Sequence, residues 1–330
     1  MTVARLEAGL KRVGLDRYMM LLIMTVLLAT FLPARGDFAD WLRGVTYWAV
    51  ALLFFIYGAK LSTSVILSGL ANWKLQVSVL LCTFAVFPLL GLVMKPLSAL
   101  WLPGAIGIGF LYIGCMPSTV QSSIAFTSIS NGNVSGAVCA ASISNLVGVV
   151  LSPLLFALLI PQGAGYGVEP SAIWRIMQQI LLPFALGQLC RPLLSDFLNR
   201  HKLPTMIVDR GSILLIVYSA FSAGVVSGIW QVIQPQSLAV LVGLCMLYLA
   251  VAMAITIAIA KSARMSRADL LALFYCGSTK SLATGLPMAG ILFVGQDISL
   301  IVLPLMLFHL IQLVVCALIS QRYAAHAVAG

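Results

Sequence analysis

The chain has 330 residues, of which 61% are hydrophobic and 8% are charged, and its formal net charge is +10. Soluble domains carry about 25% charged residues, so this composition excludes a soluble fold and predicts a polytopic membrane protein. The seven cysteines form no C-x-x-C pair. They are interpreted as small buried apolar side chains and not as a disulfide framework.

Ten hydrophobic segments follow one another along the chain, and most reach the roughly 20 residues that span a bilayer. The first follows a basic segment, 1–17, and no small-x-small cleavage site comes after it, so it is interpreted as a retained span. We predict an all-α polytopic membrane protein with ten transmembrane helices at about 18–32, 45–59, 75–94, 105–130, 134–160, 172–194, 207–230, 237–260, 268–294 and 298–320.

Basic residues lie unevenly on the two sides of these predicted spans. Of the 19 Lys and Arg residues, 14 fall in the N-terminal segment, the C-terminus and the loops after spans 2, 6 and 8. The positive-inside rule therefore places both termini in the cytoplasm. Topology accounts for the positive charge, so the expected partner is the lipid bilayer and no nucleic-acid partner is expected.

Two similar interruptions break otherwise apolar runs. Residues 114–125 read GCMPSTVQSSIA, and residues 276–287 read CGSTKSLATGLP. Such backbone cannot face lipid, because its freed N–H and C=O groups would have no partners, so it is expected to line a cavity. Paired interruptions in two halves of a chain are typical of transporter binding sites.

The two interruptions lie about 160 residues apart, with Ser118-Thr119 matching Ser278-Thr279. An odd number of spans in each half inverts the second half relative to the first. We therefore predict two inverted five-helix repeats whose broken spans 4 and 9 cross. The predicted organisation is a cytoplasmic N-terminal segment 1–17, a first repeat 18–160, a linker 161–171, a second repeat 172–320 and a C-terminal tail 321–330.

Hydroxyl and amide side chains gather at both interruptions and offer neutral oxygen ligands and hydrogen-bond donors. Helix packing is one interpretation. A substrate or ion site is favoured, because Gly114 and Pro117 break the helix at the same place. The candidate binding residues are Ser118, Thr119, Gln121, Ser122 and Ser123 in the first interruption and Ser278, Thr279, Lys280 and Ser281 in the second.

Lys280 is the one charge that the predicted spans place deep in the membrane. An isolated ammonium there costs at least about 2.5–3.5 kcal/mol. Three roles fit: coupling to substrate or protons, a tether between the broken helices in place of a metal ion, and snorkelling to an interface. His309 and Gln312 share a face of span 10, where an interhelical hydrogen bond and a proton relay are the alternatives.

The nine acidic residues all fall in loops or at span ends. A membrane carboxylate is the usual partner of sodium or a proton, so this distribution argues against ordinary cation sites. The sequence has no H-E-x-x-H motif, His/Cys cluster or acid pair, so no metal site, cofactor or catalytic residue is expected. An intramembrane enzyme that uses Ser278 or Ser281 with Lys280 is a minor alternative.

Four segments resemble the bile acid:sodium symporter family: residues 54–62 (FFIYGAKLS), 84–89 (FAVFPL), 116–126 and 276–287. The resemblance covers nearly the whole chain and points to the bacterial branch related to the seventh member of human solute carrier family ten. It implies a panel domain and a core domain with broken, crossed spans 4 and 9, and a bacterial inner-membrane location. It also implies sodium-driven transport of organic anions, such as sterol conjugates or small carboxylates.

The chain departs from this family where the resemblance places the cation ligands. Tyr275 stands near the family's Glu of span 9, and Thr279 and Lys280 stand near its Gln-Asn pair. The other departures are Ser123 in the pair after the span 4 break, Thr83 in span 3, and Ala137 and Ala141 in span 5. The candidate coupling residues are Lys280 and Thr83 from these departures, and His309 and Gln312 from their shared face of span 10.

The leading function is a secondary transporter of this symporter type, which moves an anionic small molecule with altered or absent sodium coupling. The alternative is a non-transporting regulatory membrane protein with a role related to calcium or the cell envelope. A polar cavity reachable from one side of the membrane at a time would favour the transporter, and a crossing region sealed by side chains would favour the regulatory protein.

Overall fold

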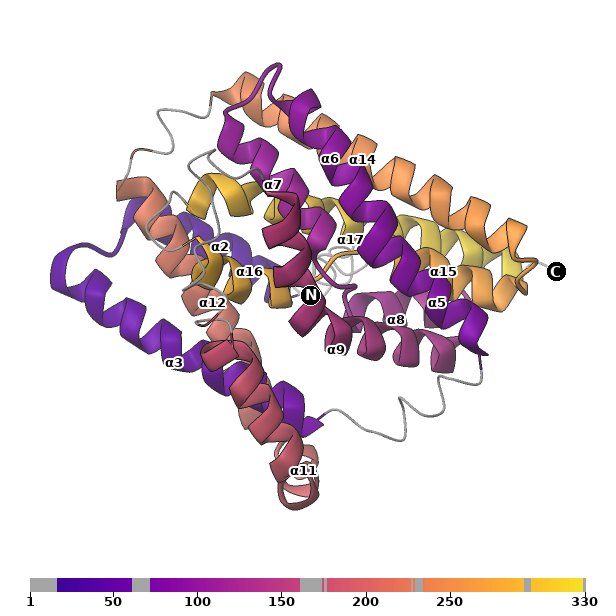
Figure 1. Cartoon of the computed structure of the whole chain (residues 1–330), viewed down its shortest axis with the longest axis horizontal. Helices are drawn as coiled ribbons and strands as arrows, with labels where there is room; N and C mark the ends of the chain where they lie inside the picture. Colours follow the sequence, from indigo (N-terminus) through magenta and orange to yellow (C-terminus); the bar gives the residue numbers. More distant parts are fainter. Residues whose placement is uncertain are drawn as a thin grey trace, which may run out of the picture.

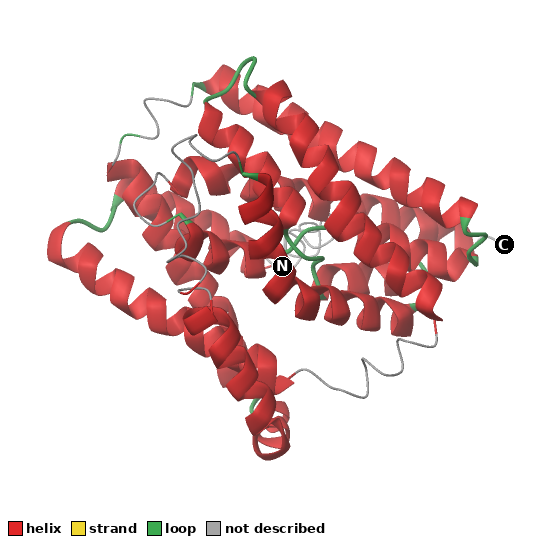
Figure 2. Cartoon of the chain, viewed as in Figure 1, coloured by secondary structure: helices red, strands yellow, loops and turns green. Residues whose placement is uncertain are grey.

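The computed structural model describes residues 17–60, 72–160, 174, 177–226, 228, 234–293 and 298–328, and every regular element in this part of the chain is a helix (Figures 1 and 2). The prediction of an all-α fold is confirmed for these residues. The predicted N-terminal segment, apart from its last residue, and the predicted linker 161–171 lie outside the described residues.

The helices vary widely in length, and several of them are pieces of one interrupted span. In chain order they are α2 (Arg17–Phe31), α3 (Gly36–Lys60), α5 (Trp73–Leu81), η2 (Cys82–Val86), α6 (Phe87–Ser98), α7 (Gly104–Cys115), α8 (Gln121–Ile129), α9 (Val134–Leu159), η3 (Met177–Leu181), α11 (Leu182–Arg200), α12 (Lys202–Val226), α14 (Pro235–Ser262), α15 (Arg267–Ser278), α16 (Leu282–Leu292) and α17 (Ile298–Val328).

Within the described part of the chain, six helical stretches are long and apolar enough to cross a membrane, which indicates an integral membrane protein. These stretches are Gly36–Lys60, Trp73–Ser98, Val134–Leu159, Leu203–Val226, Pro235–Ser262 and Ile298–Tyr323. α3 begins well before the predicted span 45–59. Its first turn contains Asp37, whose charge suits a helix N-terminus, so the helix extends beyond the apolar run.

The helices form two groups (Figure 1). α2, α3, α11 and α12 pack mainly on one another, while α5 to α9 and α14 to α17 pack together in a larger group. α3 and α11 cross very closely at two glycines. A Cβ atom at Gly58 would meet the main-chain oxygen of Phe184, and one at Gly187 would meet that of Phe55.

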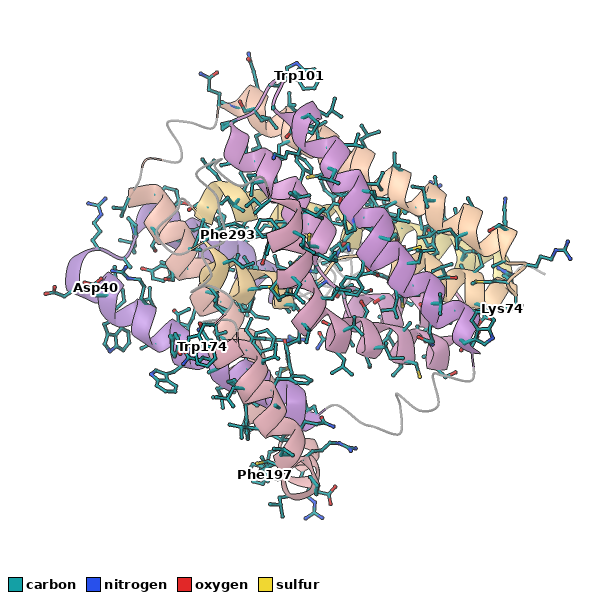
Figure 3. All side chains as sticks on the ribbon, in the orientation of Figure 1. Asp40, Lys74, Trp101, Trp174, Phe197 and Phe293 are labelled. Atoms are coloured by element: carbon teal, nitrogen blue, oxygen red, sulfur yellow. The ribbon has the colours of Figure 1, made fainter. Side chains whose placement is uncertain are left out.

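Apolar and aromatic side chains cover much of the outer surface of the helices. Trp101 and Trp174 project from the periphery with more than half of their surface exposed, whereas Phe293 lies inside (Figure 3). Exposed apolar surface of this extent is expected where helices face lipid, and tryptophans are enriched where the bilayer meets water.

The helices of predicted spans 4 and 9 are both interrupted, and the two interruptions touch. Between α7 and α8, and again between α15 and α16, the chain leaves the helical conformation for three to five residues. The N–H of Ser281 donates to the carbonyl of Pro117 at 2.9 Å. The hydroxyl of Ser118 donates to the carbonyl of Cys276 at 2.6 Å. Each break therefore satisfies polar backbone groups of the other.

Candidate functional site

Lys280 lies in the break between α15 and α16, and 0% of its surface is exposed. Its Nζ donates to three main-chain carbonyl oxygens, those of Thr83 at 2.8 Å, Gly114 at 3.2 Å and Met116 at 2.7 Å. The Nζ also lies 4.1 Å from the centroid of the Phe87 ring, where the face of the ring attracts a cation. Three acceptors match the three N–H groups of an ammonium, so the contacts fit the charged form.

The carbonyl of Thr83 is available because span 3 contains a turn of π-helix followed by a proline. In η2 the N–H of Phe87 donates to the carbonyl of Cys82, five residues earlier. In this register the next N–H along the chain would reach Thr83, but it belongs to position 88, and Pro88 has no N–H. Thr83 therefore keeps a buried acceptor, and the ammonium supplies its donor.

The carbonyls of Gly114 and Met116 are available because α7 ends between them. The N–H that would return to Gly114 belongs to Ser118, and it donates instead to the hydroxyl of Ser144 at 3.0 Å. The lysine thus joins η2, the break after α7 and its own break. Oxygen atoms that converge on a positive charge also bind hard metal ions, so these contacts suit a tether in place of a metal ion. The buried amine does not reach an interface, so the contacts do not suit snorkelling.

Gln312 of α17 pairs with both polar groups of the Lys280 peptide. Its Oε1 accepts the Lys280 N–H at 2.8 Å, and its Nε2 donates to the Lys280 carbonyl at 2.8 Å. The Nδ1 atom of His309 lies 2.8 Å from Gln312 Nε2 and 3.1 Å from the same carbonyl oxygen. α17 thereby satisfies backbone groups that the break leaves outside a helix.

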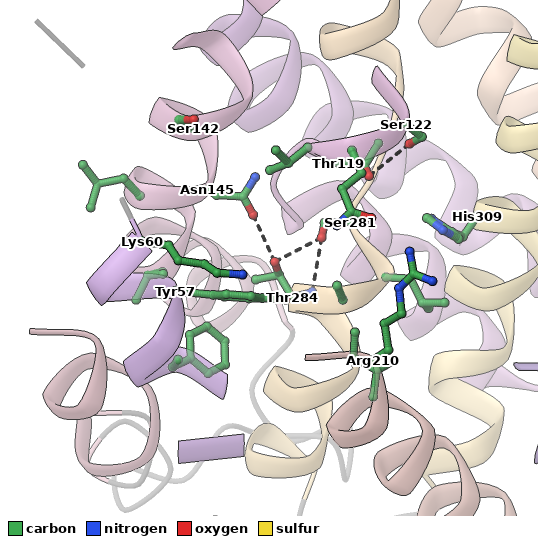
Figure 4. Close-up of a pocket in the computed structure, with 18 of the residues that line it drawn as sticks. Tyr57, Lys60, Thr119, Ser122, Ser142, Asn145, Arg210, Ser281, Thr284 and His309 are labelled. Carbon is green, nitrogen blue, oxygen red and sulfur yellow. Dashed lines mark hydrogen bonds between the residues drawn. The ribbon is translucent and has the colours of Figure 1, made fainter. Parts of the chain in front are cut away.

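A cavity of about 600 Å³ lies between α3, α11 and α12 on one side and the two breaks on the other (Figure 4). Aromatic and aliphatic side chains form one part of its wall, and hydroxyl and amide side chains form another. Its described lining residues include the basic residues Lys60, Arg210 and His309 and no Asp or Glu. The cavity wall therefore carries a positive charge balance, which suits an anion.

The first residues of two helices line this cavity from the breaks. Gln121 and Ser122 begin α8, and Leu282 and Ala283 begin α16. Main-chain N–H groups at a helix N-terminus carry partial positive charge and favour anions. Both helix starts therefore add to the charge of the basic side chains.

A hydrogen-bond network runs along the polar wall of the cavity (Figure 4). The hydroxyls of Ser281 and Thr284 lie 3.1 Å apart, and Thr284 donates to Oδ1 of Asn145 at 3.0 Å. The side chains of Lys60 and Arg210 approach the Ser281–Thr284 pair from opposite sides in this view. The network fixes the hydroxyl groups of Ser281 and Thr284 on the polar wall.

The sequence-predicted site residues fall into two sets. Those that line the cavity are Thr119, Gln121, Ser122, Ser281 and His309. Those that are buried around the breaks, outside this lining, are Ser118, Ser123, Ser278, Thr279, Lys280, Thr83 and Gln312. The ammonium of Lys280 thus lies in a carbonyl cage beside the cavity, and its backbone contacts α17.

Sequence reasoning left several polar residues of the cavity out of the candidate binding residues, and Ser142 is one of them. Lys60 and Arg210 were counted among the cytoplasmic loop charges, and Asn145 was not among the candidate binding residues. Thr284 lies within the second interruption but was also not named. In the sequence, the two basic residues were marked only by their position at the end of a span. That position does not indicate that either of them lies near the breaks.

The positions where the resemblance places cation ligands are occupied by other groups. The hydroxyl of Tyr275 lies 2.7 Å from the hydroxyl of Ser130. Ala137 and Ala141 belong to a small apolar cluster that also contains Cys82. Methyl and thiol groups are poor ligands for sodium, which prefers oxygen.

Comparisons with known proteins agree on one family. A profile of the SBF-like CPA transporter family matches residues 16–325. "Putative symporter YfeH" of Escherichia coli is 46% identical over 314 residues, which cover 94% of this chain and 93% of the relative. A Pseudomonas aeruginosa protein is 46% identical over 309 residues, with 94% and 93% covered. "Sodium/bile acid cotransporter 7" of Danio rerio is 30% identical over 269 residues, with 80% of each chain covered.

Proposed function

Because the chain belongs to the SBF-like CPA transporter family, we propose that it is a secondary transporter that moves an organic anion across a bacterial inner membrane without sodium coupling. The charge of the cavity wall is the observation that supports an anionic substrate. Lys60 and Arg210 line the cavity together with two helix N-termini, and its described lining contains no carboxylate. A site of this charge would bind a carboxylate, sulfate or phosphate group and repel a cation.

The aromatic and aliphatic part of the wall supports an organic ligand over a bare inorganic ion. Phe54, Phe184 and Ile213 lie opposite the polar breaks. A volume of about 600 Å³ falls in the range of ordinary small-molecule pockets. The proposed substrate therefore has an apolar body and at least one anionic group.

The proposed architecture has ten spans in two inverted five-helix repeats, with a panel domain and a core domain. α2, α3, α11 and α12 would form the panel, and the other helices would form the core. Lys60 and Arg210 lie on the side that the basic residues assign to the cytoplasm, together with both termini. The cavity would then belong to an inward-facing form.

The ammonium of Lys280 supports the proposed lack of sodium coupling. It bonds three carbonyl oxygens at the junction of three chain segments, where a mobile cation could otherwise contribute the same charge. A lysine side chain cannot leave its site as a bound sodium ion can, so its amine would occupy the carbonyl cage in every transport state. Substrate binding would therefore not require sodium from solution.

A ligand-stabilisation screen on purified protein tests this proposal. Thermal unfolding would be measured with taurocholate, succinate and uncharged analogues of each, in sodium chloride and in choline chloride at equal ionic strength. An anion at 100 times its Kd should stabilise the protein by about 2.7 kcal/mol in both salts. If sodium tightens anion binding tenfold or more, the coupling argument is wrong. If anions stabilise no better than their uncharged analogues, the anion site is wrong.

The minor enzyme alternative gains no support from the contacts of Lys280. The hydroxyl of Ser278 donates to the carbonyl of Phe274 at 2.5 Å, and that of Ser281 pairs with Thr284. The described hydrogen bonds of the Lys280 amine go to carbonyl oxygens. A Ser–Lys catalytic pair requires a bond from the amine to the serine hydroxyl.

A further inference from the structure

The side-chain amide of Gln312 fits the Lys280 peptide in one orientation. Its oxygen faces the peptide N–H, and its nitrogen faces the peptide carbonyl, both at 2.8 Å. In the reversed orientation two donors would oppose each other, and so would two acceptors. The backbone of Lys280 therefore fixes which atom of the amide is the nitrogen, an assignment that otherwise has to be inferred.

The nitrogen of this amide has two hydrogens, and the Lys280 carbonyl takes one of them. The second is available to His309, whose Nδ1 lies 2.8 Å from Gln312 Nε2. When this hydrogen is donated to the ring, Nδ1 is the acceptor and carries a lone pair. A neutral imidazole with an acceptor at Nδ1 has its proton on Nε2.

The second contact of Nδ1 does not favour a proton there. An Nδ1–H group could donate to the Lys280 carbonyl at 3.1 Å. It would then oppose an N–H of Gln312 at the shorter distance of 2.8 Å. An imidazolium ring has a proton on both nitrogens and meets the same conflict, so the arrangement favours the neutral ring with Nε2–H.

We propose that Gln312 is a positioning residue that holds His309 as its neutral Nε2–H tautomer, so that His309 serves as a hydrogen-bond donor to the oxyanion group of the ligand. His309 lines the cavity, and Gln312 is fully buried behind it. This inference rests on the proposed function for the identity of the ligand, whereas the tautomer can be measured without any ligand.

A neutral donor has a consequence for specificity. Lys60 and Arg210 already supply two positive charges to the cavity. A fixed Nε2–H group adds direction without adding a third charge, because a hydrogen bond weakens steeply away from linear geometry. The ring also connects the ligand to the Lys280 backbone through Gln312, so the ligand and the carbonyl cage share one chain of hydrogen bonds.

The test is nitrogen NMR of the full chain, purified in detergent and labelled with ¹⁵N-histidine. The chain has three histidines, and a His309→Gln variant identifies the signals of His309 by their loss. We expect a protonated, pyrrole-type signal for Nε2 and an unprotonated, pyridine-type signal for Nδ1, distinguished by their couplings to the two ring C–H protons. A protonated Nδ1, or two protonated nitrogens, would overturn the proposal.

Two variants separate positioning from packing. Gln312→Met removes the N–H group that faces Nδ1, so we expect His309 to become a mixture of tautomers. Gln312→Glu replaces that donor by an acceptor, so we expect the proton to move to Nδ1. The matched control is Gln76→Met, which removes a buried amide that donates to the carbonyl of Gly136 outside the cavity. An unchanged Nε2–H tautomer in both Gln312 variants would show that Gln312 does not position the ring.

The donor role is tested with potassium sulfate as the oxyanion, against potassium chloride at equal ionic strength. Sulfate should shift the Nε2 signal of His309 and leave the signals of His201 unchanged. Gln312→Met should weaken this response about tenfold in sulfate concentration, as expected for loss of one hydrogen bond to a charged group. If the tautomer is as expected but sulfate moves no His309 signal, the proposed role of His309 as a donor to the oxyanion is wrong. The transport proposal would still stand on the ligand screen.

Discussion

The Nζ of Lys280 lies 2.7 Å from the carbonyl oxygen of Met116, and this contact joins the break in one helix pair to the break in the other. The same amine reaches Thr83 and Gly114, so one side chain links three segments far apart in sequence. Among its described contacts, the Lys280 amine has no carboxylate partner. Carbonyl dipoles and the ring of Phe87 stabilise it instead.

The first prediction concerns Lys280→Ala, which empties the carbonyl cage. Three buried oxygens would lose their donor, so we expect the free energy of unfolding to fall by about 1–3 kcal/mol for each oxygen that finds no new partner. A small monovalent cation should then occupy the cage and restore part of the loss. Thermal unfolding in sodium, potassium and choline chloride measures this, and Lys261→Ala, on an exposed helix end, is the control. Equal stability in all three salts would contradict the cage.

The companion variants Lys280→Met and Lys280→Arg separate charge from shape. Methionine fills similar space without a donor, so we expect loss of ligand stabilisation and no rescue by cations. Arginine keeps the charge but has a wider planar fork that matches carboxylates better than three converging carbonyls. Full ligand stabilisation in both variants would assign Lys280 a packing role alone.

Pro88→Ala is a second prediction, and its expected sign is unusual. Removing a proline from a helix normally stabilises it. Here the new N–H at position 88 can bond the Thr83 carbonyl and displace the ammonium. We expect a loss of about 1 kcal/mol, the size of one net hydrogen bond. Pro96→Ala, at an exposed position in the same helix α6, should be neutral or stabilising, and thermal unfolding compares the two. Stabilisation by Pro88→Ala would contradict the orphaned carbonyl.

The crossing of α3 and α11 gives a third prediction with an internal control. A methyl group at Gly58 would overlap the main-chain oxygen of Phe184, so we expect Gly58→Ala to cost about 1–3 kcal/mol through overpacking. Gly44, in the same helix, has nothing within 4 Å of an added Cβ. Gly44→Ala should therefore stabilise by up to about 1 kcal/mol through helix propensity. Equal effects in thermal unfolding would contradict the close crossing.

The sequence predicted those parts of the fold that depend on local chemistry. Pro117 and the polar run around Lys280 predict interruptions in apolar helices, and both breaks are present. Lipid cannot satisfy the backbone groups that a break frees, so both breaks were expected to lie inside the protein. The partners of Lys280 could not be predicted in the same way. The Thr83 carbonyl is free only because η2 adopts a π-helical register, and a turn of π-helix has no periodic signal in an apolar run.

The cavity shows the same limit for charged residues. Lys60 and Arg210 are 150 positions apart in the sequence, and each reads as an ordinary cytoplasmic anchor at the end of a span. Only the packing of α3 and α12 against the two breaks brings both to one cavity. By contrast, Thr119, Gln121 and Ser122 were found because they lie within the interruption itself.

The last prediction tests these two cations as ligands of the anion. Arg210→Gln and Lys60→Gln each remove one charge from the cavity wall and keep a polar, hydrogen-bonding side chain, although a shorter one. We expect each to raise the Kd of the anion selected by the stabilisation screen about tenfold or more, because hydrogen bonds to charged groups contribute about 1.5–3 kcal/mol. Arg210→Lys should lose less affinity, since it keeps the charge and loses only the planar fork.

The control is Lys261→Gln, which makes an equal change of net charge on an exposed helix end outside the cavity. It should leave the Kd within about twofold at physiological salt, where distant exposed charges are screened. If Lys261→Gln weakens binding as much as the cavity variants do, the anion responds to the overall field of the protein and does not contact these two side chains.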